Sequence, residues 1–546
     1  MTNDAADVAV VGLGAMGAMS AWRLAARGAR VIGFERFRPG HDRGSSHGDT
    51  RIFRTAYFES PDYVPLLQRA NSLWRQLEDE SGAELLTITG GLAIGPPDGE
   101  LVSGVLASAR QNDLPHHLLD IAQMKSRYPQ HRLERGEIAV REDEAGYLRP
   151  ERSVAAAAAR AEALGARLLI ETEVEAIDVS GSGVMIRTSR GRFAAERALI
   201  TAGAWTPKVL ARLHLPLTVE RQVLAWLAVD NPASFAPELF PVFIRETQDG
   251  RFRYGFPTTD GRSIKLGRHH EGDDVDPDSI DREVRESDLE PIRDFARANL
   301  FGVTDDVVTA CVCMYTNTPD EHLLVGPLPA RPRVTMAGGC SGHSFKFAPV
   351  LGDVAADIAT HGTTERDIAA LTVDRRFGSE WRYCNGTVLR RCSATGAVWL
   401  HTGVDIKTGI QPVMAAANGV IIGYIVDPTF RGGVLIRHQT PDGVVITQYW
   451  HVWPRPGYAV GTVVARGEVF ADIADMGSRT HFHFAVFSGD YDSHTWNGAL
   501  PPARCDGFPA FPYHFVDPTA FVQAHLEPAP EKVVRHGGHG LQEVAP

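Results

Sequence analysis

The turn Gly12-Leu13-Gly14-Ala15-Met16-Gly17 constrains the fold most, because it joins an apolar run over residues 8–11 to a helical pattern over residues 15–26. Glycines at these three places allow a tight bend, a close approach of backbone to a pyrophosphate, and close packing of helix on strand. A second strand over residues 30–34 ends at Glu35, whose carboxylate can accept hydrogen bonds from a ribose. A glycine-rich helix cap is the alternative. The strand–helix–strand context favours a Rossmann-like dinucleotide-binding domain.

Length and charge exclude several classes of protein. The chain has 546 residues, which at about 150 residues per domain predicts three or four units. Its formal net charge of −12 argues against a broad surface for nucleic acid or anionic membranes, so we expect neither partner. The early apolar stretch over residues 8–22 contains three glycines and follows acidic residues, which is typical of neither a signal peptide nor a membrane span. Six scattered cysteines predict a reducing, cytoplasmic location.

The dinucleotide-binding sheet is predicted to be discontinuous in sequence. Its later pieces are helices over 153–164 and 349–360 and strands over 167–171, 174–179, 197–200 and 333–337, with a second glycine turn at 201–205. Aromatic and charged strands between residues 219 and 305 predict an antiparallel, substrate-binding sheet. We expect nucleotide-binding parts over about 1–85, 150–217 and 320–377, and substrate-binding parts over about 86–149 and 218–319.

The composition changes after residue 377. Residues 384–500 are rich in Gly, Val, Ile, His and aromatic residues, with turn dipeptides at Asn418-Gly419 and Asp442-Gly443 and no long helical period. This pattern predicts a separate all-β domain over residues 384–525. We expect residues 526–546 to form a disordered tail.

Five motifs in the first part of the chain agree in order and spacing with one family of enzymes. They are residues 44–54 (GSSHGDTRIFR), 254–257 (YGFP), 265–269 (KLGRH), 313–322 (CMYTNTPDEH) and 341–347 (SGHSFKF). With them, residues 5–377 resemble the monomeric sarcosine oxidase and N-methyltryptophan oxidase family of flavoproteins. The resemblance implies a D-amino-acid-oxidase-like fold, with an α/β Rossmann-like FAD-binding domain and an antiparallel substrate domain.

The resemblance also implies a covalent FAD, attached through the sulfur of Cys313. The other cofactor-binding residues that it implies are Gly12, Gly14, Gly17, Glu35, Arg36, Ser45, Thr50, Val174, Gly342 and Lys346. His270 and Cys340 depart from the family pattern or have no assigned role. We interpret both as structural.

The implied reaction is oxidation of a secondary amine R–NH–CH3 by O2 to an imine, which hydrolyses to an amine and formaldehyde, with H2O2 as the second product. Arg54 offers a planar fork and Lys346 a point charge for the carboxylate of a small amino acid. Tyr254 and His269 would line the other side of the substrate. Sarcosine, N-methyltryptophan, pipecolate and fructosyl amino acids are all open as substrates.

The resemblance implies Lys265, Arg51 and His269 as the catalytic residues. By the family resemblance Lys265 lies over the flavin, where it can hold a water and stabilise charge as oxygen is reduced. Arg51 would support the anionic reduced flavin and assist the covalent attachment.

The second part of the chain carries a pattern of metal-binding residues. His401 and Asp405 are followed by His451 and by His481-Phe-His483. An H-x3-D spacing with a later H-x-H on a strand suits a tetrahedral Zn²⁺ with one open position. With these residues, and with residues 409–413 (GIQPV) and 415–419 (AAANG), residues 384–525 resemble the lysostaphin-type zinc endopeptidases.

That second resemblance implies ligands and partners. The ligands would be His401, Asp405 and His483, with His451 and His481 activating water, and the partner would be a glycine-rich or cell-wall peptide. The alternatives are a histidine-rich β domain without metal, a non-catalytic zinc-binding or peptide-binding module, and a peptidase whose flavoprotein half is an accessory. Residues 392–396 depart from the family pattern at the cleft rim.

Overall fold

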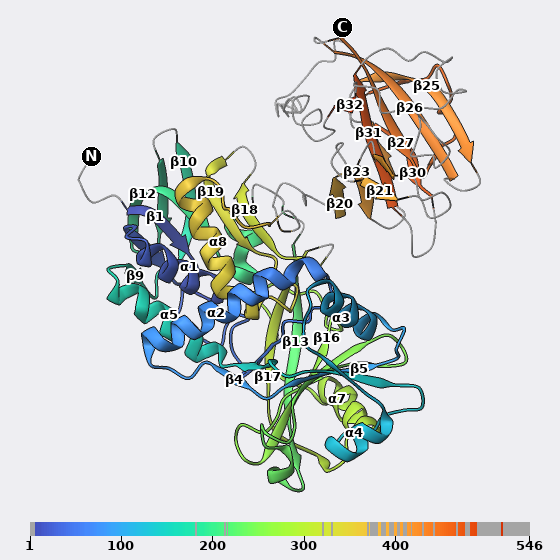
Figure 1. Cartoon of the computed structure of the whole chain (residues 1–546). Coiled ribbons are helices and arrows are strands. Elements are labelled where there is room, and N and C mark those ends of the chain that lie inside the picture. The colour runs from blue at the N-terminus through green and yellow to red at the C-terminus, as the bar shows by residue number, and fades with distance from the viewer. Residues whose placement is uncertain are drawn as a thin grey trace, which may run out of the picture. The chain divides into compact units, whose positions relative to one another are not determined.

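The computed structural model divides the chain into two units, residues 1–378 and 379–546 (Figure 1). In the first unit the structure describes residues 6–371 except 181–182, 212–214, 216, 319–320, 329–330 and 369–370. In the second it describes residues 380–383, 389–391, 398–400, 404–407, 412–415, 418–427, 431–440, 443–465, 468–474, 481–488 and 515–516. The predicted tail over residues 526–546 lies outside the described residues.

The first sheet carries the glycine turn. Its strands run in the order β10-β11-β12-β1-β2-β9, with β19 paired to β12 and β18 to β19. Their bounds are β1 (Ala6–Val11), β2 (Val31–Phe34), β9 (Arg167–Leu169), β10 (Val174–Ser180), β11 (Gly183–Thr188), β12 (Gly191–Ile200), β18 (Leu324–Leu328) and β19 (Arg331–Gly338). The strands around β1 are parallel, whereas β10-β11-β12 and β18-β19 are antiparallel. The sheet draws on three distant parts of the chain.

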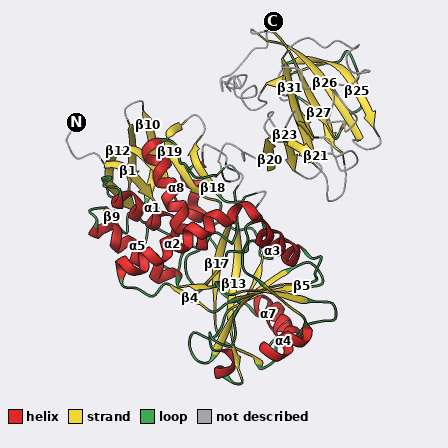
Figure 2. Cartoon of the chain, in the orientation of Figure 1, coloured by secondary structure: helices red, strands yellow, loops and turns green. Residues whose placement is uncertain are grey.

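Four helices pack on one another beside this sheet (Figure 2). They are α1 (Ala15–Ala26), α2 (Val64–Ser81), α5 (Pro150–Ala163) and α8 (Ala348–His361). Alternate residues of β1 face opposite sides, so that Val8 and Val10 pack with these helices and Ala9 and Val11 pack in a second cluster. Burial on both faces explains why β1 is a continuous apolar run.

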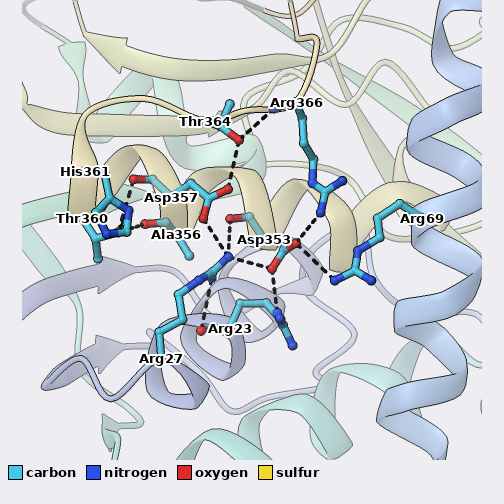
Figure 3. Close-up of polar contacts among 10 residues, drawn as sticks. All are labelled: Arg23, Arg27, Arg69, Asp353, Ala356, Asp357, Thr360, His361, Thr364 and Arg366. Carbon is cyan, nitrogen blue, oxygen red and sulfur yellow. Dashed lines mark hydrogen bonds and ion pairs between the residues drawn. The ribbon is translucent and has the colours of Figure 1, made fainter.

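Asp353 of α8 joins the helices electrostatically. Its carboxylate receives ion pairs from Arg23 of α1 (2.8 Å), from Arg27 directly after α1 (2.7 Å), from Arg366 (3.2 Å) and from Arg69 of α2 (3.7 Å), as Figure 3 shows. The Asp353 side chain is only 4% exposed. Burial alone would raise the pKa of Asp353, but the arginines hold it below its usual range. This carboxylate therefore ties α8 to α1 and α2.

The second sheet is mixed, and the prediction of an antiparallel sheet is wrong for one pair. Its order is β17-β13-β16-β15-β14-β5-β7-β6, and β14 runs parallel to β5. The bounds are β5 (Gly91–Gly95), β6 (His117–Leu119), β7 (Ile138–Glu142), β13 (Thr218–Val229), β14 (Val242–Glu246), β15 (Phe252–Gly255), β16 (Ser263–His269) and β17 (Val303–Asn317). The parallel pair arises because β5 comes from a distant segment rather than from a hairpin with β14.

Further elements complete the first unit. Helices α3 (Glu100–Gln111), α4 (Ile121–Arg127) and α7 (Glu286–Asn299) lie with the second sheet, and α6 (Thr206–Val209) follows β12. A three-stranded sheet, β3-β8-β4, joins β3 (Arg51–Phe53), β8 (Gly146–Leu148) and β4 (Leu86–Ile88). No helix within the described residues is long and apolar enough to cross a bilayer.

The second unit contains a larger sheet in the order β20-β23-β31-β27-β26-β25-β29, with β32 paired to β31. Its strands are β20 (Glu380–Tyr383), β23 (Val404–Lys407), β25 (Gly419–Asp427), β26 (Arg431–Thr440), β27 (Gly443–Trp450), β29 (Val463–Val464), β31 (His481–Ser488) and β32 (Phe515–Val516). Smaller sheets pair β21 (Leu389–Arg391) with β22 (Val398–Leu400), and β30 (Val469–Ile473) with β24 (Pro412–Met414) and β28 (Val452–Pro454). Apolar residues of β25, β26 and β27 pack with residues of β24, β28, β29 and β30 in the described core.

Candidate active site

The glycine turn between β1 and α1 has the geometry that its three glycines require. Gly12 has φ +92°, and a Cβ there would lie 2.7 Å from the Thr201 carbonyl oxygen. A Cβ at Gly17 would lie 1.8 Å from the Gly12 carbonyl oxygen, so α1 packs against the turn itself. At Gly14 the nearest atom to a Cβ is Ser46 Oγ, at 3.8 Å, which leaves this backbone open. The turn can therefore accept a pyrophosphate at the start of α1.

Glu35 lies at the end of β2 and is bound to the same turn. Its carboxylate accepts hydrogen bonds from the backbone N–H of Leu13 (2.8 Å) and of Phe37 (2.9 Å). Burial alone would raise the pKa of Glu35, but hydrogen bonds from His41, Phe37 and Leu13 lower it overall. Glu35 is therefore an ionised acceptor at the edge of the turn.

A cavity of about 350 Å³ extends from the glycine turn to β17. Of the predicted cofactor-binding residues, it is lined by Gly12, Gly14, Glu35, Arg36, Ser45, Val174 and Gly342. Gly17 packs beneath the turn, and Thr50 and Lys346 line a second cavity. Arg36 Nη1 donates to Asp278 at 2.7 Å, where Trp205 Nε1 also donates at 2.8 Å. The open backbone at Gly14, the Glu35 carboxylate and these polar residues together fit FAD.

Cys313 lies on β17 with two cationic groups beside it. Arg51 Nη2 lies 3.5 Å from the Cys313 sulfur. Burial alone would raise the pKa of Cys313, but the charges of Arg51 and His47 lower it to about 6. The neighbouring thiols also change the pKa of His47. Burial alone would lower it, but Cys311 and Cys313 raise it to about 9. The Cys313 sulfur is therefore poised as a thiolate.

The second cavity, of about 80 Å³, contains the predicted substrate-binding residues. Thr50, Arg51, Arg54, Tyr254, Lys265, His269 and Lys346 all line it. Arg51, Tyr315 and Gly342 line both this cavity and the larger one, so the two cavities meet at these residues. The fold therefore brings the motif at residues 44–54 and Lys346 of the motif at 341–347 to the motifs at 254–257 and 265–269 on β15 and β16.

Lys265 is buried within β16. Its Nζ donates hydrogen bonds to the carbonyl oxygens of Gly48 (2.8 Å) and Thr50 (2.6 Å), and lies 4.3 Å from the centre of the Phe256 ring. Burial, and then the charge of Arg51, hold the pKa of Lys265 well below its ordinary value. The amine is thus fixed at the wall of the small cavity by two backbone carbonyls.

Arg54 is engaged by a carboxylate of the chain itself. Its Nη2 donates to both oxygens of Glu59 at 2.7 Å, and its guanidinium lies 4.3 Å from the centre of the Tyr57 ring. The Glu59 carboxylate therefore occupies part of the Arg54 guanidinium, the group that we expect to bind a substrate carboxylate. Lys346 lies nearby, with Nζ donating to the His343 carbonyl oxygen at 2.5 Å. Burial, and then the charge of Arg54, lower the pKa of Lys346 to about 7.

Tyr254 and His269 lie on neighbouring strands β15 and β16. Burial raises the pKa of Tyr254 to about 12, so this phenol stays protonated. His269 Nδ1 lies 3.3 Å from the Tyr315 hydroxyl. Both side chains are therefore neutral hydrogen-bonding groups of the small cavity, since burial and nearby cations also lower the pKa of His269 well below its ordinary value.

The sequence reasoning missed several residues that the structure brings into the site. Tyr315, His47 and His343 fall within the quoted motifs, so their position in those motifs was an available signal. Glu59 and Tyr57 lie outside every motif, and no pattern in the sequence distinguishes them. Cys340, interpreted as structural, lines the larger cavity.

In the second unit the structure describes part of the predicted metal site. The register of β23 and β31 pairs Asp405 with His483, and that of β27 and β31 pairs Trp450 with His483. His481 begins β31, and His451 follows β27, is buried and has φ +63°. His401 lies outside the described residues. Within the described part of the chain, no group of three or more His, Cys, Asp or Glu side chains is arranged to hold a metal ion.

Comparisons with known proteins concern the first unit. Residues 7–358 match the family described as FAD dependent oxidoreductase. Monomeric sarcosine oxidase of Streptomyces avermitilis is 42% identical over 66% of this chain and 95% of its own length. N-methyl-L-tryptophan oxidase of Salmonella arizonae is 33% identical over 68% of this chain and 98% of its own length.

Solved structures share the same fold. NikD, an unusual amino acid oxidase essential for nikkomycin biosynthesis, is 25% identical, with a TM-score of 0.61 over 68% of this chain and 98% of its own. Glycine oxidase from Geobacillus kaustophilus is 23% identical, with a TM-score of 0.57 over 68% of this chain and 99% of its own. Over residues 7–358 the chain therefore belongs to the family of FAD-dependent oxidoreductases that contains the monomeric sarcosine oxidases and the N-methyl-L-tryptophan oxidases.

Proposed function

We propose that residues 1–377 catalyse the FAD-dependent oxidation of an N-methyl amino acid such as sarcosine, with O2 and water, to the amino acid, formaldehyde and H2O2. The observation that carries the proposal is the junction of the two cavities at Arg51, Tyr315 and Gly342. The larger cavity suits a dinucleotide, and the smaller one presents Arg54 and Lys346 to a substrate carboxylate. The identities of the relatives named above support the same reaction class.

The first task of the chain is to bind the carboxylate. Arg54 would exchange the Glu59 carboxylate for that of the substrate, and Lys346 would add a second charge. A substrate anion near Lys346 would favour its protonated form. Tyr254 and His269 would orient the amine, because both are neutral hydrogen-bonding groups on the cavity wall.

The residues that would hold the cofactor are those of the glycine turn, Glu35 and Cys313. When bound, FAD would supply the acceptor for the two electrons taken from the C–N bond. Cys313, as a thiolate, would form the covalent attachment, with Arg51 beside the sulfur as its counter-charge. Lys265 would hold a water at the cavity wall, and its protonated form would stabilise negative charge that develops on oxygen.

Oxygen uptake by the full-length, flavin-loaded protein tests this proposal. Sarcosine is compared with glycine, which has the same carboxylate but no N-methyl group. We expect uptake with sarcosine that falls by about 100-fold in Arg54→Met and less in Arg54→Lys, since lysine retains the charge but not the fork. Absence of uptake with every N-methyl amino acid tried would exclude the reaction.

For residues 384–525 we propose an all-β, zinc peptidase-like module that holds Zn²⁺ through His401, Asp405 and His483, with a glycine-rich or cell-wall peptide as its partner. The register that pairs Asp405 with His483 supports this, because it sets two of the three proposed ligands on adjacent strands. His451 follows the residue paired to His483 in β27.

The metal content of the full chain tests this second function. We expect about one zinc per chain, and zinc-dependent clearing of bacterial cell walls that His401→Ala abolishes. A chain without zinc that still binds glycine-rich peptide would instead be a binding module.

A further inference from the structure

His270 occupies an unusual backbone position directly after β16. Its φ of +54° lies in the left-handed region that residues other than glycine rarely adopt. Its imidazole faces two carboxylates, with Nδ1 3.3 Å from Glu220 Oε2 and Nε2 3.8 Å from Glu321 Oε2. Burial lowers the pKa of His270, but Glu220 and Glu321 raise it above its ordinary value overall. The surroundings thus favour the imidazolium form.

Glu220 of β13 is a fixed anion. Its side chain is only 7% exposed and accepts hydrogen bonds from Gln222 Nε2 (2.6 Å), Gly272 N–H (2.7 Å) and Asn317 Nδ2 (2.7 Å). Burial alone would raise the pKa of Glu220, but His270 and the hydrogen bonds from Gly272 and Asn317 lower it. Glu321, in contrast, is 63% exposed, so solvent screens its interaction with His270. Glu220 is therefore the main partner of the His270 imidazolium.

The His270 ring lies directly against His269, with 4.1 Å between the ring centres. Both rings also contact Tyr315, at 5.5 Å for His269 and 5.4 Å for His270. His269 and Tyr315 line the small cavity. The side chain of His270 thus adjoins two residues of the proposed substrate site.

The other groups that act electrostatically on His269 are all bases, which are positively charged when protonated. They are His343, Lys346 and Arg54, and together with burial and His270 they lower the pKa of His269 well below its ordinary value. Among His270, His343, Lys346 and Arg54, the side chain with a ring contact to His269 is His270.

We propose that His270 is a positioning residue whose imidazolium, held by Glu220, keeps His269 neutral, so that the His269 ring can face the substrate amine without repelling it. The statement about the amine rests on the proposed oxidase function. The charge relation between the two histidines does not, and it can be measured without turnover.

Titration of histidine ring signals by NMR, in the full-length flavoprotein with [13Cε1]histidine, tests this inference. In His270→Asn the cation is lost, and asparagine tolerates the left-handed backbone. We expect the pKa of His269 to rise by at least about one unit in this variant, and to stay low in His270→Arg, which keeps the charge. An unchanged pKa of His269 in a folded His270→Asn variant would overturn the proposal.

A second variant covers the case in which His270→Asn does not fold. Glu220→Gln should lower the pKa of His270 itself by about one unit, whereas Glu321→Gln, at the exposed carboxylate, should lower it by less than half of that. An unchanged pKa of His270 in Glu220→Gln would overturn the proposal.

Kinetics separates this inference from the oxidase function. In His270→Asn the acid limb of kcat/KM for the amine should move to higher pH by the same amount as the pKa of His269, while kcat changes less than twofold. If the NMR shifts occur in a protein that oxidises no N-methyl amino acid, the oxidase proposal fails and the charge relation stands.

Discussion

Arg51 Nη2 lies 3.5 Å from the sulfur of Cys313, although the two residues are 262 positions apart in the chain. Arg51 is fixed by the carbonyl oxygens of Thr50 (2.8 Å) and Ser45 (2.7 Å), and Cys313 by its place in β17. The guanidinium is therefore a permanent counter-charge for the sulfur, and it lies where the larger cavity meets the smaller one.

The first prediction concerns this thiol. Arg51→Gln should raise the pKa of Cys313 from about 6 toward its ordinary value of 9.0, because the counter-charge is lost, whereas Arg51→Lys should raise it less. The measurement is the rate of Cys313 alkylation against pH in flavin-free protein, followed by peptide mass spectrometry. The same midpoint in wild type and Arg51→Gln would refute the assigned role of Arg51.

The second prediction concerns competition at Arg54. Glu59→Gln removes the anion that occupies the Arg54 fork, so a substrate carboxylate no longer has to displace it. We expect KM for sarcosine to fall by about 3- to 10-fold with little change in kcat. Glu59→Asp, which keeps the charge, is the matched control. A rise in KM in Glu59→Gln would show that Glu59 supports the substrate site rather than competing for it.

The third prediction concerns pH and Lys346. Because the pKa of Lys346 is about 7 in the unliganded site, the amine is cationic below that pH and loses its charge above it. KM for the substrate should therefore increase as pH rises through 7. In Lys346→Arg that dependence should flatten, since arginine stays charged, and in Lys346→Met it should vanish at a uniformly higher KM. A pH dependence that persists in Lys346→Met would assign it to another group.

The fourth prediction concerns the stability of the first unit. Asp353→Asn should lower the free energy of unfolding by about 3 kcal/mol, because several arginines lose their shared buried anion. Asp357→Asn, at a side chain that is 26% exposed and pairs with Arg27, should cost less than about 1 kcal/mol. Denaturant unfolding, followed at the transition of the first unit, measures the change in the free energy of unfolding for both variants.

The sign of the pH effect at Asp353 follows from its lowered pKa. The stabilisation is fully present above the pKa of an unfolded aspartate and is lost as pH falls through the lower, folded value. The difference in stability between wild type and Asp353→Asn should therefore shrink in acid. A difference that stays constant as pH falls would contradict the ion-pair account.

Local patterns predicted the helices beside the first sheet well. The helix expected over residues 15–26 is confirmed as α1 (Ala15–Ala26), and the one over 349–360 as α8 (Ala348–His361). Glycine spacing and apolar periodicity specify such elements because they depend on neighbours in sequence. The parallel pairing of β5 with β14 could not be predicted, since register between distant strands leaves no trace in local alternation.

The same distinction applies to the site. Motif residues such as Lys265 and His269 were identified because their spacing matched a known family, and their roles stay predictions. Glu59 lies five residues after Arg54, but no motif marks the pair. His270 gains its partner from Glu220 of β13, 50 positions away, so that contact depends on the fold.

The most direct test of the central claim is the product balance of the full-length, flavin-loaded protein acting on sarcosine labelled in its N-methyl group. The account predicts one labelled formaldehyde, one glycine and one H2O2 for each O2 consumed. Oxygen consumption without labelled formaldehyde, or turnover of glycine at the same rate as sarcosine, would contradict it.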